Sequence, residues 1–201
     1  MRKGIAFIVS GPSGGGKTTL AKSMLHELDN LRFSVSCTTR KPREGEVDGK
    51  DYKFITNEEF ENMVQQERFI EHAFVHGNYY GTPVEEFEDA KASGVDLLLD
   101  IDVQGASQIK QSYPEAIFCF VMPPTFEILK DRLSRRNGNG DIDIDQRLVR
   151  AKEEMAPSVL EQYDFIIIND QLDEALETIH SIIISTRCQS ERVLEKIKEN
   201  L

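Results

Sequence analysis

Four short runs of apolar residues are spread along the chain. They are Ile5–Val9, Leu97–Leu99, Ile117–Met122 and Phe165–Ile168. Uninterrupted apolar runs of this length are typical of strands that are buried on both faces of a sheet. We therefore expect these four segments to form the strands of an interior sheet.

Between those runs, apolar residues recur every three or four positions, which is the spacing of an amphipathic helix. The segments with this pattern are 20–28, 126–133 and 172–183. Strands that alternate with helices favour a parallel sheet, because parallel neighbours need a crossover connection that a helix usually supplies. The predicted fold class is α/β, with a parallel sheet flanked by helices.

Two segments interrupt this alternation. Residues 34–83 hold extended pieces at Tyr52–Ile55 and Phe69–Phe74, and a helix that begins with a capping box at Thr56–Glu59. They are predicted to form a small inserted α+β lobe. Residues 128–155 carry arginines at both ends and a glycine- and asparagine-rich middle, which predicts a helical lid of two helices joined by a tip. We expect one domain over residues 1–201, with a core of residues 1–33, 84–127 and 156–201.

The composition of the 201-residue chain is that of a globular protein, with 39% hydrophobic and 29% charged residues. Lysine and arginine total 24 and aspartate and glutamate total 35, so the formal net charge is −11. Such acidity argues against a nucleic-acid polymer as partner, because binding a polymer requires broad neutralisation of phosphates. It does not exclude a single nucleotide, which needs only a local basic pocket.

Neither a membrane partner nor a disulfide framework is expected. The longest apolar run, Ala116–Met122, has seven residues, whereas about 18 are needed to span a bilayer. Cys37, Cys119 and Cys188 lack the spacing of metal ligands or disulfide pairs, which favours a reducing, cytoplasmic compartment. The amphipathic helix after Leu172 could carry a contact between two copies, so both a monomer and a homodimer stay open.

The segment Gly11–Thr18 has the pattern G-x-x-x-x-G-K-[ST] between a predicted strand and a predicted helix. Its glycines allow backbone N–H groups to approach phosphate oxygens, and the helix N-terminus adds positive charge. Lys17 is expected to contact the β- and γ-phosphates and Thr18 to ligate Mg²⁺. The motif predicts phosphate binding on a P-loop NTPase-type sheet, against the alternative of a glycine-rich turn without a ligand.

Two aspartates follow the second predicted strand. Alternation places Asp100 and Asp102 on the same side of the chain, at the carboxyl end of the strand. Ligands of open α/β sheets bind at that edge, so Asp100 is a candidate to hold Mg²⁺, directly or through water. Two solvated loop aspartates are the alternative.

A cluster of small polar and basic residues spans Ser34–Arg43. Arg40 and Arg43 are placed to grip a phosphate group with paired hydrogen bonds. Taken alone, the cluster is equally typical of a solvated basic turn.

With this cluster and several further stretches, the sequence resembles the guanylate kinase family, whose members phosphorylate GMP. The matching stretches are Ser10–Gly14, Phe33–Ser36, Thr38–Arg40 with Pro42 and Arg43, Gly45–Tyr52, Gly77–Gly81, Asp100–Asp102 with Gln104 and Gly105, and Ile168–Asp170. They run in family order through nearly the whole chain. The resemblance implies a nucleoside monophosphate kinase core, with a GMP-binding lobe at residues 34–83 and a lid at residues 128–155.

The resemblance also implies roles for individual residues. The GMP phosphate is assigned to Arg40, Arg43, Tyr52 and Tyr80, and the guanine base to Ser36, Glu71, Thr82 and Asp102. ATP is assigned, with the motif, to Gly11, Pro12, Ser13, Gly14, Gly15, Gly16, Lys17, Thr18, Thr19 and Asn169. Without the resemblance, Glu71 would be interpreted as an ordinary surface acid.

Five arginines flank the predicted lid tip, at positions 132, 135, 136, 147 and 150. Arginines that close over a transferring phosphoryl group would stabilise its charge; helix-surface ion pairs are the alternative. The resemblance assigns catalysis to Arg132, Arg136 and Arg147, together with Lys17. For Arg150 we favour an ion pair, and the choice between Arg135 and Arg136 stays open.

The function predicted from these features is ATP:GMP phosphotransfer by an enzyme of the nucleoside monophosphate kinase class. The expected ligands are GMP, the co-substrate ATP, and Mg²⁺ held by Thr18 and Asp100. One alternative is a non-catalytic guanylate-kinase-like module that binds protein partners. Another is a P-loop kinase that acts on a different small acceptor.

Overall fold

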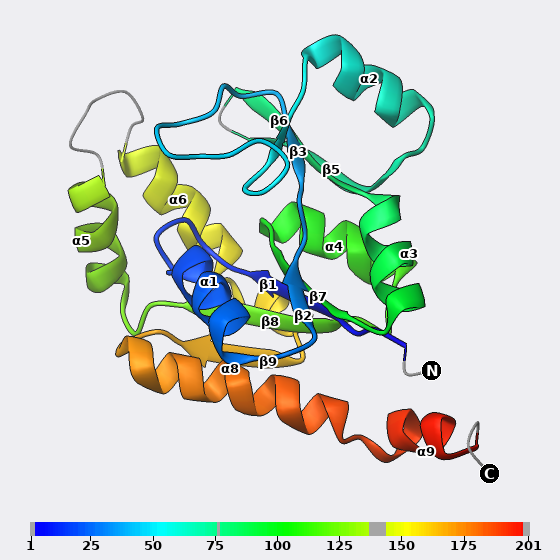
Figure 1. Ribbon diagram of the computed structural model, residues 1–201. Helices are drawn as coiled ribbons and strands as arrows, with labels where there is room; N and C mark the ends of the chain where they lie inside the picture. The colour runs from blue at the N-terminus through cyan, green and yellow to red at the C-terminus, as the bar shows by residue number, and fades with distance from the viewer. Residues whose placement is uncertain (1–2, 76, 137–143, 199–201) are drawn as a thin grey trace.

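The computed structural model describes residues 3–75, 77–136 and 144–198, without the side chains of residues 136, 195 and 196 (Figure 1). Its centre is a five-stranded sheet in which every neighbouring pair of strands is parallel. In spatial order the strands are β2 (Leu31–Phe33), β7 (Asp96–Asp100), β1 (Ala6–Ser10), β8 (Ile117–Met122) and β9 (Phe165–Ile168). The predicted α/β class is confirmed.

The four strands expected from apolar runs all form, and β2 adds a fifth that the pattern did not predict. The expected burial is wrong for β9, which is an edge strand with Phe165, Ile166 and Ile168 exposed. The sequence of β2, Leu31-Arg32-Phe33, is short and has a cation at its centre. All three residues are only partly buried, so no continuous apolar run marks this strand. β2 forms because it pairs with β7, a contact that a local pattern does not encode.

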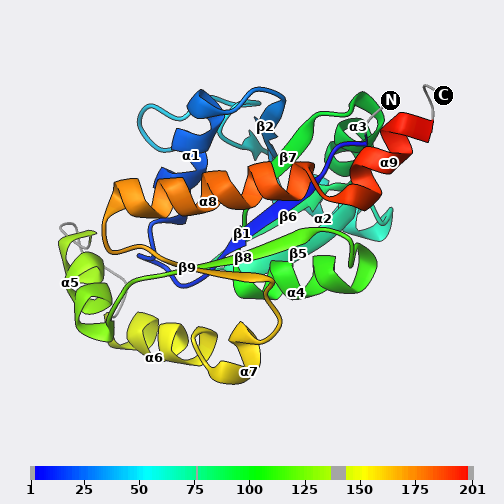
Figure 2. The ribbon, with the colours of Figure 1, turned by 90° about the horizontal axis from the view of Figure 1, so that it is seen from below.

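Helices cover both faces of the sheet (Figure 2). One core cluster joins the sheet to α1 (Lys17–Glu27) and α8 (Leu172–Arg187), and a second joins it to α3 (Val84–Ser93) and α4 (Val103–Ser112). Successive side chains of a strand point to opposite faces. Phe7 accordingly belongs to the first cluster and Ile8 to the second.

A second sheet lies beyond the carboxyl edge of the first (Figure 1). Its strands, in spatial order, are β4 (Lys53–Phe54), β3 (Cys37–Thr38), β6 (Asn78–Pro83) and β5 (Phe69–Val75). The predicted capping box is present at α2 (Asn57–Gln65), where Thr56 Oγ1 accepts from Glu59 N at 3.1 Å and Glu59 Oε2 accepts from Thr56 N at 2.8 Å. Phe60 then packs α2 on this sheet, with its ring 4.5 Å from that of Phe69.

Residues 126–154 form two helices, α5 (Phe126–Arg136) and α6 (Ile144–Glu154), and the expected tip at residues 137–143 lies outside the described residues. The two helices share a small core of Leu129, Leu133, Leu148 and Ala151. The short α7 (Pro157–Leu160) precedes β9, and α9 (Ser190–Lys198) follows α8. Of the helices described, none has both the length and the apolar character needed to cross a membrane.

One buried carboxylate ties four parts of the core together. Asp96 is fully buried; its Oδ1 accepts from Ile5 N at 2.8 Å and its Oδ2 accepts from Arg187 Nε at 2.8 Å. The Arg187 guanidinium also donates to Asp29 O at 2.9 Å. The start of β1, the start of β7, the end of α8 and the turn after α1 are therefore joined at one point.

Replacing Asp96 with alanine should lower the free energy of unfolding by about 3–5 kcal/mol, because it leaves a mostly buried guanidinium without its partner. Urea unfolding measures the change. Glu85→Ala is the control: it breaks the exposed pair between Glu85 and Arg68, whose side chains are 52% and 47% exposed, and should cost about 1 kcal/mol or less. Equal losses in the two variants would contradict the structural role of Asp96.

Candidate active site

The loop between β1 and α1 contains two positions, Gly11 and Gly16, whose backbone conformation suits glycine only. Gly11 and Gly16 have φ values of 136° and 97°, a region that other residues rarely adopt. A Cβ at Gly11 would lie 2.2 Å from Val121 O, and one at Gly16 would lie 2.1 Å from Asn169 Nδ2. The loop therefore lies tightly against the ends of β8 and β9, with its N–H groups at the start of α1.

Lys17 and Thr18 begin α1 directly after this loop. Lys17 Nζ donates to Gly11 O at 2.8 Å and to Pro12 O at 3.2 Å, so the ammonium group lies over the loop. Thr18 Oγ1 donates to Asp100 Oδ2 at 2.5 Å. Parallel pairing of β1 with β7 creates this contact, because it aligns Val9 with Asp100, the last residue of β7.

The Thr18–Asp100 pair fits a magnesium ion, which prefers oxygen ligands and keeps several waters. The described residues contain no cluster of three or more histidine, cysteine, aspartate or glutamate side chains that could hold a metal by themselves. A metal at this pair would therefore take its remaining ligands from phosphate and water oxygens. That partial set of protein ligands is usual for Mg²⁺ bound with a nucleotide.

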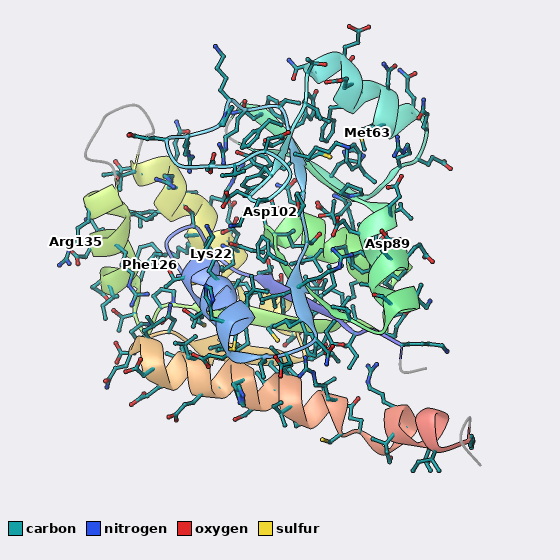
Figure 3. The ribbon with its side chains drawn as sticks, viewed as in Figure 1. Lys22, Met63, Asp89, Asp102, Phe126 and Arg135 are labelled. Carbon is teal, nitrogen blue, oxygen red and sulfur yellow. The ribbon has the colours of Figure 1, made fainter. Side chains whose placement is uncertain are left out.

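A cavity of about 900 Å³ lies between the loop, the second sheet and α6. Figure 3 labels Asp102, which lies in this region where the two sheets approach each other. The predicted site residues that line it are Gly11, Ser13, Gly14, Gly16, Lys17, Thr18, Ser36, Tyr52, Glu71, Tyr80, Asp100, Asp102 and Arg147. Residues as far apart in the chain as Ser13 and Arg147, 134 positions, thus face one space.

The other predicted residues lie around this cavity rather than on its wall. They are Pro12, Gly15, Thr19, Arg40, Arg43, Thr82, Arg132 and Asn169. Thr82 is buried and hydrogen-bonds to Glu71, which does line the cavity. Thr19 and Arg43 are exposed. The side chain of Arg136 lies outside the described residues.

Glu71 is a buried carboxylate with a short chain of hydroxyl groups beside it. Its side chain is 4% exposed, and Oε1 accepts from Thr82 Oγ1 at 2.6 Å. Thr82 Oγ1 is in turn 3.2 Å from Ser36 Oγ. Burial raises the pKa of Glu71 to about 7, while the Thr82 hydrogen bond opposes this shift and the Asp102 charge adds to it.

The first turn of α4 forms the other side of the Glu71 environment. Asp102 caps this helix by accepting from Gly105 N at 2.8 Å. A Cβ at Gly105 would lie 2.5 Å from Glu71 Oε2, so the carboxylate is packed against bare backbone. The positive end of α4 partly offsets the cost of a buried negative charge.

Arg40 is enclosed by aromatic rings and a carboxylate. Its guanidinium carbon lies 5.0 Å from the ring centre of Tyr52 and 5.6 Å from that of Phe54. Nη1 and Nη2 donate to the two carboxylate oxygens of Glu46 at 2.6 and 2.7 Å. The Arg40 hydrogen bonds lower the pKa of Glu46 to about 2, so this pair is ionised at neutral pH.

Two of the predicted lid arginines contact the phosphate-loop region. Arg147 Nη2 donates to Ser13 Oγ at 2.7 Å, and Arg132 Nη2 donates to Asn169 O at 2.9 Å. Asn169 Nδ2 itself donates to Gly15 O at 2.8 Å, which places that buried amide under the loop. Both arginines therefore connect α5 and α6 to the loop and its support.

Arg135 and Arg150 differ in position. Arg135 is 79% exposed on the outer side of α5, where it pairs with Asp131 at 2.9 Å (Figure 3). Arg150 lies on the wall of the cavity, near Glu154 one turn along α6. Arg150 is also exposed, so the helix-surface ion pair favoured for it from the sequence stays a prediction.

Two acids near the site were not among the residues chosen from the sequence. Glu154 lines the cavity, and burial raises its pKa to about 7 against the opposing charge of Lys17. Glu46 holds Arg40. No local signal distinguishes either one, although Glu154 follows Arg147 and Arg150 at positions that place all three near one face of α6.

A family model described as guanylate kinase matches residues 3–186. The chain belongs to the guanylate kinase family. It is 46% identical to the guanylate kinase of Geobacter metallireducens over 198 residues, which cover 98% of this chain and 97% of that one. The guanylate kinase of Geobacter sulfurreducens is 44% identical with the same coverage. The crystal structure of guanylate kinase from Anaplasma phagocytophilum superposes with a TM-score of 0.77 at 35% identity, covering 96% of this chain and 90% of that one.

Family membership confirms the resemblance predicted from the sequence. As a guanylate kinase family member, the protein is an enzyme of the nucleoside monophosphate kinase class. The function of this family is ATP-dependent phosphorylation of GMP. The phosphate loop and the adjoining cavity of this structure are consistent with that class.

The raised pKa of Glu71 has a consequence for stability. Because the folded pKa of about 7 exceeds the ordinary value of 4.5, the folded state binds the proton more tightly. The contribution of Glu71 is therefore most favourable below about pH 4.5 and is lost as pH rises through about 7. The Glu71→Gln variant has no titratable group at this position, so its stability lacks this dependence on pH. The free energy of unfolding of the variant, relative to the parent, should rise between pH 5 and pH 8 in urea titrations; a constant difference would contradict it.

Proposed function

We propose that this protein transfers the γ-phosphoryl group of ATP to GMP, giving ADP and GDP. The supporting observation is that one cavity is lined both by the phosphate loop, with Lys17 and Thr18, and by the buried acid Glu71. The first set suits a nucleoside triphosphate and the second suits a purine base. Two nucleotides that face each other across one cavity are what a phosphoryl transfer between them requires.

The group of Glu71, Ser36 and Thr82 suits guanine. Guanine presents an imino N–H and an exocyclic amine side by side, and the Glu71 carboxylate can accept from both. The Ser36 hydroxyl can donate to the base carbonyl, while Thr82, whose proton goes to Glu71 Oε1, holds that carboxylate in place, and Asp102 adds an acceptor beside them. Adenine has a ring lone pair in place of the imino proton, so it would leave a buried carboxylate without its partner, which is costly.

The GMP phosphate is proposed to bind Arg40, Arg43, Tyr52 and Tyr80. Two arginines and two phenolic hydroxyls supply the donors that a doubly charged phosphate needs. The rings of Tyr52 and Tyr80 lie 6.0 Å apart, and both line the cavity. Burial raises the pKa of Tyr52 to about 12, so its hydroxyl stays protonated and can donate.

The chemistry needs no general base, because the attacking oxygen of GMP is already anionic at neutral pH. Lys17, Arg132, Arg136 and Arg147 are proposed to align the two nucleotides in line and to stabilise the charge on the transferred group. Thr18 and Asp100 would hold Mg²⁺, which neutralises phosphate charge when bound. Closure of α5 and α6 would exclude water and so limit hydrolysis of ATP.

The division of the chain follows from these roles. We propose a core of residues 1–33, 84–127 and 156–201, a GMP-binding lobe of residues 34–83 and a lid of residues 128–155. The support is that the second sheet with α2 and the pair of α5 and α6 each have packing of their own. A non-catalytic protein-binding module is the less favoured alternative, because Lys17, Thr18 and Glu71 are all in place.

A coupled assay of ADP release with MgATP tests the function. ADP release should require GMP, should give GDP in equal amount, and should be far slower with AMP, UMP or dTMP. Lys17→Ala should reduce turnover at least about a hundredfold, because one donor to the transferred group is removed, with an unchanged circular dichroism spectrum. ADP release that ignores GMP, or normal turnover by the alanine variant, would contradict the proposal.

Glu71→Gln tests base recognition separately. The amide keeps the shape of the side chain but accepts from one guanine donor only, so kcat/KM for GMP should fall about ten- to a hundredfold. The KM for ATP should change little. Glu61→Gln, on the exposed surface of α2, is the matched control and should behave as the parent. Unchanged preference for GMP over AMP in Glu71→Gln would remove Glu71 from the base site.

A further inference from the structure

The guanidinium of Arg40 has five N–H donors, and three of them are engaged on one side. Nη1 and Nη2 donate to the two oxygens of Glu46, and Nη1 also donates to Lys41 O at 3.0 Å. Glu46 and Lys41 leave Nε–H and the second N–H of Nη2 unused, and Arg40 also hydrogen-bonds with the side chain of Tyr80. These two N–H groups lie along one edge of the planar group, and that edge matches the spacing of two oxygens on a phosphate.

The same carboxylate also holds the turn that carries Arg43. Glu46 Oε2 accepts from Arg43 N at 2.7 Å, and Glu46 N donates to Arg43 O at 3.1 Å. One side chain therefore fixes both the guanidinium of Arg40 and the backbone of Arg43. These are the two arginines assigned to the GMP phosphate.

Glu46 pairs with Arg40 without lining the cavity. Tyr52 and Tyr80 line the cavity, whereas Glu46 does not. The ring of Tyr52 lies against the guanidinium, and the Tyr80 hydroxyl lies beside it. The carboxylate thus holds Arg40 without itself occupying the cavity wall that Tyr52 and Tyr80 line.

We propose that Glu46 is a positioning residue for GMP phosphate recognition: it holds the Nη end of Arg40 so that the Nε–Nη2 edge is presented to the phosphate. The inference rests on the proposed function. Without Glu46, a long and flexible side chain between two aromatic rings would have to be ordered by the substrate itself, which lowers affinity. The strongly lowered pKa of Glu46 keeps its charge available at any pH at which the enzyme works.

The test compares ligands with and without the phosphate. Glu46→Gln keeps the size of the side chain but weakens the paired, charge-assisted hydrogen bonds to Arg40. The dissociation constant for GMP should rise about tenfold, while the inhibition constant of guanosine, which lacks the phosphate, should stay within about twofold. The KM for ATP should not change. Glu44→Gln, in the same exposed loop without a hydrogen bond among the described residues, is the matched control and should resemble the parent.

A double-mutant cycle tests whether Glu46 influences GMP binding through Arg40. In an Arg40→Ala background, Glu46→Gln should weaken GMP binding much less, because the guanidinium that it positions is gone and the glutamine oxygen can still accept from Arg43 N. Equal weakening of GMP and guanosine would show a general structural role and overturn the proposal. Tighter GMP binding by Glu46→Gln would show that Glu46 competes with the phosphate, which also overturns it. Failure of the proposed function is distinguished by the parent enzyme, which would then show no GMP-dependent turnover.

Discussion

The parallel pairing of β1 with β7 and β8 is the constraint on which the rest of the site depends. It aligns Val9 with Asp100 and Ser10 with Phe120, so the strands end together at one edge. The chain leaving β1 must then turn sharply against Val121 to reach α1, which is why Gly11 is required there. The turn aims backbone N–H groups and a helix N-terminus at the same point as the Asp100 carboxylate. The pairing of β1 with β7 and β8 thus brings together the groups that attract phosphate and the two side chains of the partial metal site.

The second sheet adds an acid at a considerable electrostatic cost. Glu71 is withdrawn from water, and its raised pKa measures how unfavourable the charged form is. The Thr82 hydroxyl and the first turn of α4 offset part of that cost. A carboxylate held in this state gains more from a ligand with two adjacent N–H donors than an exposed one would. The burial that destabilises Glu71 in the free protein is therefore the source of the proposed selectivity.

Several cations near the cavity are held in place by hydrogen bonds to neighbouring groups. Arg40 is held by Glu46, Arg147 contacts Ser13, and Lys17 is folded onto the carbonyls of its own loop. In a chain with a net charge of −11, these cations lie close to acids such as Asp100 and Glu154, which line the same cavity. The phosphate groups of the two nucleotides are the ligands proposed for these cations.

The sequence by itself determined the features whose physical cause is local. Apolar runs predicted four of the five central strands, the box at Thr56–Glu59 predicted the start of α2, and the G-x-x-x-x-G-K-[ST] pattern predicted the loop, since each depends on neighbouring residues only. Resemblance to a family supplied candidate residues such as Glu71, which no local pattern marks. Only the tertiary structure decided that β2 is a strand, that Glu71 is buried against Gly105, and that Glu46 pairs with Arg40. The first two rest on contacts between residues far apart in the chain, and the third on the folded shape of a loop, so their energies exist only once the chain has folded.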